Sequence, residues 1–204
     1  MSIVKKGLIG MAAALLLAGM SFAQNNPPNS SDNTKTTANG GVPTSDRKFM
    51  DKAAQGGMAE VELGQLAEQN AQNPDVKAFA QRMVTDHSKA NDQLKQLAAQ
   101  QGVSLPTTLD AQDRATKARL EKLHGAAFDK AYMHDMVMDH KKDVAEFKHE
   151  SSAARTPALR DWAQQTTPTL ESHLQEAEKV APQVGAQTSA SAMDKGMNTS
   201  AESH

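Results

Sequence analysis

Four residues of types that bind metal ions stand in otherwise apolar positions of this chain: Glu60, His87, His140 and His173. Each interrupts a series of apolar side chains that recur every three or four residues, which is the spacing of one face of an α-helix. Burying a carboxylate or an imidazole is costly unless the group is hydrogen-bonded or binds a metal. Three imidazoles and one carboxylate therefore predict a site for one divalent ion of zinc, copper, manganese or iron.

Two aspartates accompany this set. Asp86 and Asp139 each directly precede one of the histidines, and each is a candidate to accept a hydrogen bond that fixes the tautomer of a ring. An alternative is that the set binds no metal. The four residues would then form a buried hydrogen-bond network that fixes how the helices align.

Two other metal chemistries can be weighed from the sequence. A carboxylate-bridged di-iron centre needs Glu-x-x-His on two helices. It is disfavoured, because the residues three positions before His87 and His173 are Val84 and Leu170. The methionines of residues 132–140 could recruit copper through their soft thioethers, but methionines at helical spacing more commonly fill a core.

Four helices must position these residues. The apolar periodicity predicts them over about 46–70, 74–101, 126–151 and 157–180. Asn73-Pro74 and Thr156-Pro157 combine a capping residue with proline at the first helical position, and Ser45-Asp46 can cap the first helix. No segment alternates with a period of two, so we expect no sheet. The predicted fold class is all-α, a four-helix bundle.

The connector between the second and third helices, residues 103–125, leaves two topologies open. Gly102 and Pro106 end the second helix, and Gly125 is a candidate break after a further helical stretch. If the connector crosses back along the bundle, all four polar residues fall near mid-height. If it simply extends the third helix, His140 lies away from the others. The shared level of the polar residues favours the crossover.

The start of the chain is typical of an export signal. Lys5 and Lys6 precede an apolar run at residues 8–18, and small residues lead to Ala23, after which we expect cleavage. A membrane anchor is the alternative, but the run is shorter than the roughly 20 apolar residues of a spanning helix. We therefore expect an exported, periplasmic protein without a membrane span after cleavage.

The remaining chain divides by composition. Residues 24–45 and 184–204 are polar and rich in Pro, Gly, Asn, Ser and Thr, so they cannot bury enough apolar surface to fold. We interpret them as a disordered linker and a disordered tail. The bundle is assigned to residues 46–183, which is long enough for a sizeable core.

Composition excludes several functions. The 204 residues include no cysteine, which rules out disulfides, thiolate metal sites and cysteine nucleophiles. The formal net charge of −2 comes from 22 basic and 24 acidic residues, so a nucleic-acid partner is not expected. No phosphate-binding loop and no nucleophile elbow is present. We assign no catalytic residue, and a protein partner stays an open question.

Several short motifs, in their order and spacing, resemble a known family, the bacterial exported proteins of domain-of-unknown-function family 4142 (DUF4142). The motifs are Ala59-Glu60-Val61-Glu62, Val76-Lys77-Ala78-Phe79-Ala80, Met83-Val84-x-Asp86-His87, Phe128-Asp129-x-x-Tyr132 and Thr169-Leu170-x-x-His173-Leu174. The resemblance covers about residues 46–181. It implies a ferritin-like four-helix bundle with a long connection between helices 2 and 3, and no established activity. The family is often labelled an outer membrane protein, but nothing in the sequence predicts the alternating strands of a barrel.

These observations lead to three functional hypotheses. The first is a non-enzymatic periplasmic bundle that binds one transition metal, for metal handling or protection against envelope stress. The second is a structural or interaction protein whose inward histidines only bond to one another. The third is a mononuclear metalloenzyme, which would need an open coordination position.

Overall fold

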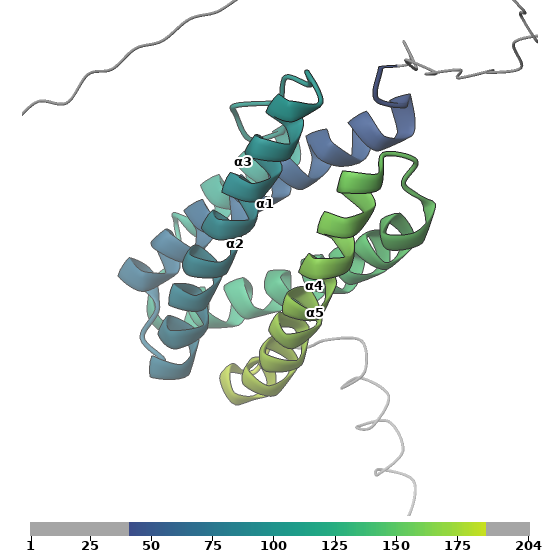
Figure 1. Ribbon diagram of the computed structural model, residues 1–204. Helices are drawn as coiled ribbons and strands as arrows, with labels where there is room; N and C mark the ends of the chain where they lie inside the picture. Colours follow the sequence, from purple (N-terminus) through teal and green to yellow (C-terminus); the bar gives the residue numbers. More distant parts are fainter. Residues whose placement is uncertain (1–40, 187–204) are drawn as a thin grey trace, which may run out of the picture. The chain divides into compact units, whose positions relative to one another are not determined.

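The structure is a computed structural model, and it describes residues 41–186. The predicted signal (1–23), most of the predicted linker (24–45) and most of the predicted tail (184–204) lie outside the described residues. Within residues 41–186 all regular structure is helical (Figure 1). The elements are α1 (Thr44–Asn70), α2 (Pro74–Gln100), α3 (Ala111–Leu120), α4 (Gly125–Ala153), α5 (Pro157–Val180) and a short 3₁₀ helix, η1 (Ala181–Val184).

The ends of α2 follow the sequence signals closely. The side chain of Asn73 accepts hydrogen bonds from the amides of Asp75 and Val76, and Pro74 occupies the first helical position. At the other end Gly102 has a φ of +66°, a left-handed conformation that glycine adopts without the strain of a Cβ atom. These predictions of the start and the stop of α2 are confirmed.

The predicted cap of α1 is wrong, whereas Thr156 and Pro157 occupy the predicted positions at the start of α5. Helix α1 begins at Thr44, two residues before the predicted start, and no side chain caps it. The carboxylate of Asp46 is instead fully buried and accepts a hydrogen bond from the amide of Thr156, at 2.6 Å. Thr156 does precede α5, but its side chain makes no capping bond. A long-range partner has thus taken the carboxylate that the local pattern assigned to a cap.

Two helical hairpins, α1–α2 and α4–α5, make up most of the fold (Figure 1). Each turn is held by a buried aspartate of the other hairpin. Asp129 of α4 accepts hydrogen bonds from the amides of Gln72 and Asn73 in the α1–α2 turn, at 3.1 and 2.9 Å. Asp46 of α1 does the same for Thr156 in the α4–α5 turn. These bonds fix the relative height of the two hairpins.

The connector crosses back along the bundle rather than extending α4. Residue 103 leaves the far end of α2, and α3 then packs against α1. By Leu123 the chain has returned to the α1–α2 turn, where the backbone oxygen of Leu123 accepts a hydrogen bond from Nδ2 of Asn70 at 3.2 Å. Gly125, with a φ of +59°, then starts α4.

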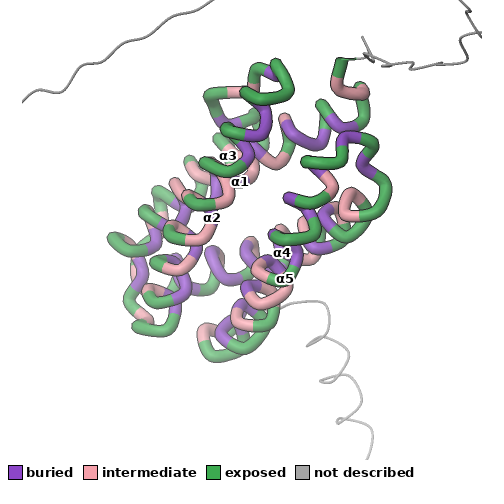
Figure 2. Tube along the Cα trace, in the orientation of Figure 1, coloured by how far each residue is buried: buried purple, intermediate pink, exposed green. Residues whose placement is uncertain are grey.

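The apolar core is split into two clusters with a polar level between them. The first lies towards the α1–α2 turn and includes Leu63, Phe79 and Tyr132; the second lies towards the other end and includes Phe49 and Trp162. Buried positions face inward along all four long helices (Figure 2). No helix in residues 41–186 is long and apolar enough to cross a membrane.

Candidate metal centre

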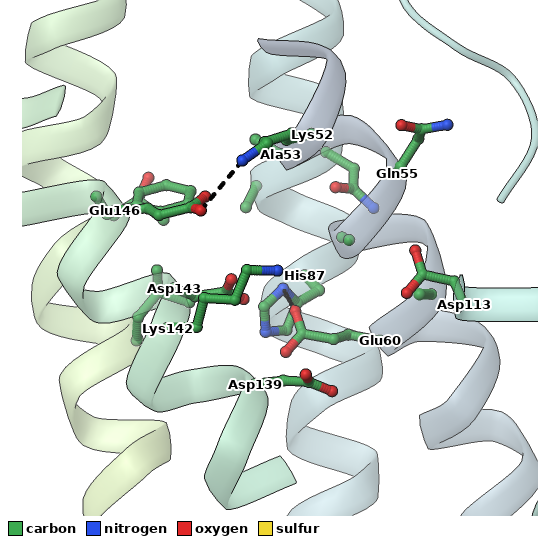
Figure 3. Close-up of a pocket in the computed structure, with 18 of the residues that line it drawn as sticks. Lys52, Ala53, Gln55, Glu60, His87, Asp113, Asp139, Lys142, Asp143 and Glu146 are labelled. Atoms are coloured by element: carbon green, nitrogen blue, oxygen red, sulfur yellow. Dashed lines mark hydrogen bonds and ion pairs between the residues drawn. The ribbon is translucent and has the colours of Figure 1, made fainter. Parts of the chain in front are cut away.

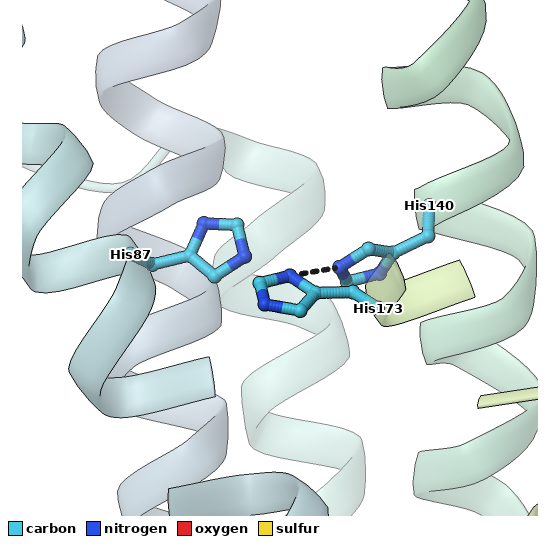
Figure 4. A group of neighbouring side chains, drawn as sticks. All are labelled: His87, His140 and His173. Atoms are coloured by element: carbon cyan, nitrogen blue, oxygen red, sulfur yellow. Dashed lines mark hydrogen bonds between the residues drawn. The ribbon is translucent and has the colours of Figure 1, made fainter. Parts of the chain in front are cut away.

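Three of the four predicted ligands, the histidines, come together at the level between the two apolar clusters, and Glu60 contacts two of them. Glu60 comes from α1, His87 from α2, His140 from α4 and His173 from α5. Their exposed fractions are 5%, 6%, 0% and 0%. One ring nitrogen from each histidine lies within 4.8 Å of the others, and the three rings converge from different helices (Figure 4). The crossover allows this, because it brings α4 to the same height as α1 and α2.

The distances between these groups already approach those around a metal ion. A tetrahedral ion with metal–nitrogen bonds of about 2.0–2.1 Å places its ligand atoms roughly 3.3–3.4 Å apart. Nε2 of His140 lies 3.3 Å from Nδ1 of His173 and 3.4 Å from Oε1 of Glu60. Two of the six edges of a tetrahedron, both at His140, are therefore present at this length.

Each histidine has one ring nitrogen bonded to an oxygen, which lies outside the centre for His140 and His173 and belongs to Glu60 for His87. Nδ1 of His140 lies 2.9 Å from the backbone oxygen of Met136, which can only accept, so this nitrogen carries the proton. Nε2 of His173 donates to Asp86 at 2.8 Å. Nδ1 of His87 donates to Oε2 of Glu60 at 2.7 Å.

In the neutral rings, the remaining nitrogens all carry lone pairs, and these are the atoms that converge. Oε1 of Glu60 and Nε2 of His87 are buried and have no hydrogen-bond partner in the described part of the chain. In these tautomers three imidazole lone pairs thus converge, and Oε1 of Glu60 lies 3.4 Å from Nε2 of His140 with no proton between the two atoms. This is the tautomer pattern of metal-binding histidines, whose other nitrogen is held by a carboxylate or a carbonyl.

Burial and neighbouring charges favour the protonation states that a metal needs at Glu60, His140 and His173. Burial alone would raise the pKa of Glu60, but the facing histidines lower it to about 2, so the carboxylate is ionised. Burial lowers the pKa of His140, and it lowers that of His173 to about 4 even though the bond to Asp86 opposes the change. Near neutral pH the centre therefore offers the carboxylate of Glu60 and the uncharged imidazoles of His140 and His173.

The two predicted accompanying aspartates have different surroundings. Asp86 contacts a histidine of another helix, His173, and also lies 3.3 Å from Nε of Arg82. Arg82 in turn bonds to Glu176 and Ser172 of α5. Sequence reasoning missed Arg82, whose spacing to Asp86 suggests only an ordinary helical ion pair.

Asp139 lies on the other side of the centre, in the lining of a cavity of about 350 Å³ (Figure 3). No hydrogen bond from a histidine to Asp139 is present among the described residues. The cavity is also lined by Glu60, His87, Asp113 and Asp143. Burial raises the pKa of Asp113 to about 6, and the charge of Asp110 adds to the rise. Burial likewise raises the pKa of Asp139 to about 6, with the charge of Glu60 as the next cause.

The methionines of α4 belong to the core rather than to the centre. Met133 and Met136 are fully buried in the apolar cluster near the α1–α2 turn, while Met138 is 44% exposed. The three sulfur atoms therefore do not share one face of the helix. This arrangement supports the core interpretation over a methionine-rich copper site.

Comparisons with known proteins agree with the fold. Residues 31–180 match the sequence profile of a family described as a domain of unknown function, DUF4142. The crystal structure of a DUF305 fragment from Deinococcus radiodurans is similar over 71% of this chain and 99% of that one, with a TM-score of 0.63 and 16% identity. At this identity the likeness shows the fold alone. No curated protein matches the chain.

Proposed function

The chain belongs to the DUF4142 family, and we propose that it is a periplasmic, ferritin-like helical bundle that binds one divalent transition metal in its core. The ligand atoms are Oε1 of Glu60, Nε2 of His87, Nε2 of His140 and Nδ1 of His173. The role of the protein is to hold or transfer the ion, in metal handling or in protection of the cell envelope against metal stress.

One observation carries the proposal, the convergence of three buried imidazole nitrogens, with Oε1 of Glu60 lying 3.4 Å from one of them. Without a cation, the lone pairs of His140 and His173 face each other across 3.3 Å. Glu60 also keeps one buried oxygen without a hydrogen bond. A hydrogen-bond network that needs no metal would place a proton between such atoms, and the bonds to Met136 and Asp86 take those protons outward.

The donor set limits the choice of metal. Three imidazoles and a carboxylate suit zinc, copper, manganese or iron, and the absence of thiolates removes the strongest preference for soft ions. Four protein ligands on four helices favour a stored ion over a catalytic one, which keeps a coordination position open. The proposed location is supported by the sequence of residues 1–23.

The first test is elemental analysis of the mature protein, purified untagged from the periplasm, together with thermal melts. We expect about one metal ion per chain. At a free metal concentration 100 times the Kd, the bound ion stabilises the fold by about 2.7 kcal/mol, or about 5–11 °C in Tm for a chain of this size. Mass spectrometry of the N-terminus checks the predicted cleavage after Ala23.

The matched variant is His173→Gln, because it removes one ligand without leaving a buried charge unpaired. Asp86 retains its contact with Arg82 in this variant. We expect the metal-dependent rise in Tm to disappear, while the melt in the presence of a chelator shows that the variant still folds. If the parent protein binds none of the four ions, and none of them shifts its Tm, the metal proposal is wrong and the histidines form a structural network.

A further inference from the structure

The cavity beside the centre gives solvent a path to two of the four ligands. Glu60 and His87 line it, whereas His140 and His173 do not. In these two ligands, Oε1 of Glu60 and Nε2 of His87 are the atoms that have no hydrogen-bond partner among the described residues. In Figure 3 both side chains lie at the cavity, between α1 and α4. The centre is therefore approachable through this cavity at Glu60 and His87.

The lining of this cavity is strongly acidic. Carboxylates come from three helices, and only two lysines offset them, of which Lys52 is already paired with Glu146 at 3.3 Å. The second, Lys142, makes no ion pair within 4 Å in the described part of the chain. The acidic lining residues are Glu60, Asp110, Asp113, Asp139, Asp143 and Glu146.

These carboxylates do not form a second metal site. Within residues 41–186, the three histidines are the one group of three or more such residues whose ligand atoms all come within 4.8 Å of one another. No three carboxylates of the cavity are therefore close enough to coordinate one ion together. Carboxylates that surround a path without converging act through their field, which raises the local concentration of cations in a cleft.

We propose that this cavity is the path by which the metal cation reaches the core, with Asp113 and Asp139 attracting the hydrated ion towards Glu60 and His87. The inference rests on the proposed metal centre and adds a route to it. The other cavity near the centre, of about 220 Å³, touches Asp86 but none of the four ligands. It offers no comparable access.

Lys142 has the opposite effect in this arrangement. Its ammonium group lies at the cavity lining near Asp143 (Figure 3) and lowers the negative potential that the aspartates create. The ammonium group therefore repels a cation that enters the cavity. Removing the charge of Lys142 should accelerate binding, whereas removing the charges of the aspartates should slow it. The route therefore predicts that the two kinds of substitution change the rate of metal binding in opposite directions.

The experiment measures the rate at which Co²⁺ enters the chelator-treated protein, by stopped-flow absorbance at pH 7.5 and low ionic strength. We expect Asp113→Asn/Asp139→Asn to lower the association rate constant by about threefold to tenfold. Lys142→Gln should raise it, and added salt should reduce both differences. Glu121→Gln is the control, because this exposed acid of the same charge lies outside the cavity.

All variants should bind one Co²⁺ per chain at saturation, since the four ligands are unchanged. Circular dichroism melts check that each variant folds. Equal association rates for the parent, the double variant and Lys142→Gln would overturn the route while leaving the centre in place. Failure of the parent itself to bind Co²⁺, Zn²⁺, Cu²⁺, Mn²⁺ or Fe²⁺ would overturn the centre, and the route with it.

Discussion

Asp86→Asn tests whether the tautomer of His173 is what prepares the centre for a metal. Asp86 accepts the proton on Nε2 of His173 at 2.8 Å, which leaves the lone pair on Nδ1, the proposed ligand atom. An asparagine can present its amide hydrogens instead, which would favour the proton on Nδ1 and block that atom. Even when its oxygen accepts, a neutral bond is about half as strong as a charged one.

The expected cost follows from this geometry. Loss of a carboxylate that orients a histidine ligand typically lowers metal affinity by about 10- to 100-fold, which corresponds to about 1.4–2.7 kcal/mol. The effect on the metal-free protein should be smaller, because Asp86 is 31% exposed and is also held by Arg82. We expect the free energy of unfolding of the metal-free protein to fall by about 1 kcal/mol. The assay is competition for Zn²⁺ against a chromogenic chelator at pH 7.5.

Glu176→Gln is the matched control for this variant. Glu176 also contacts Arg82, at 2.5 Å, and the substitution removes the same charge, but no contact joins Glu176 to a histidine in residues 41–186. We expect the control to retain its Zn²⁺ affinity to within about twofold. Equal losses in both variants would mean that the general field of the acids, and not the tautomer of His173, sets the affinity. An unchanged Kd for Asp86→Asn would refute the reasoning outright.

Two further predictions concern the scaffold. Gly64→Ala should destabilise the fold by about 1–3 kcal/mol in urea unfolding, because its Cβ would lie 2.8 Å from Cγ2 of Val84. A Cβ at Gly56 has no atom within 4 Å, so Gly56→Ala should raise the free energy of unfolding by up to about 1 kcal/mol. Equal effects of the two substitutions would contradict the close packing of α1 on α2. In the metal-free protein, burial raises the pKa of Asp113 from 3.8 to about 6, so the folded state binds more protons than the unfolded state between those values. Stability from this group then falls as pH rises from about 4 to 6, and the same pH series on Asp113→Asn should lack that fall.

Local sequence signals predicted most of the helices, because helix periodicity and caps depend on neighbours in the chain. Asn73-Pro74 starts α2 as expected, and Gly102 ends it. The same logic failed at the start of α1, where Asp46 was predicted to cap its own helix. Its carboxylate binds the amide of Thr156, 110 residues away. Capping preferences cannot anticipate such a partner, since they describe only the first turn of a helix.

The sequence also identified the four candidate ligands, because a polar residue on an apolar helix face is conspicuous wherever the chain goes. Two features of the site could not be predicted in this way. Arg82 reaches α5 as well as Asp86, and Asp113 lies on the connecting helix α3. Both are ordinary charged residues in their local context. Their importance comes from the segments that pack against them.

By itself, the sequence determined the residue types, their inward faces and hence the kind of ion that could bind. Tertiary structure decided whether these side chains would meet. The crossover of α3 sets the height of α4, and the bonds of Asp129 and Asp46 to the opposite turns fix the two hairpins at a common level. The ring nitrogens that remain available are likewise decided by contacts between helices, as the bond from His173 to Asp86 illustrates. Coordination depends on distances of a few ångströms between segments far apart in the chain, and a periodic pattern carries no information on those distances.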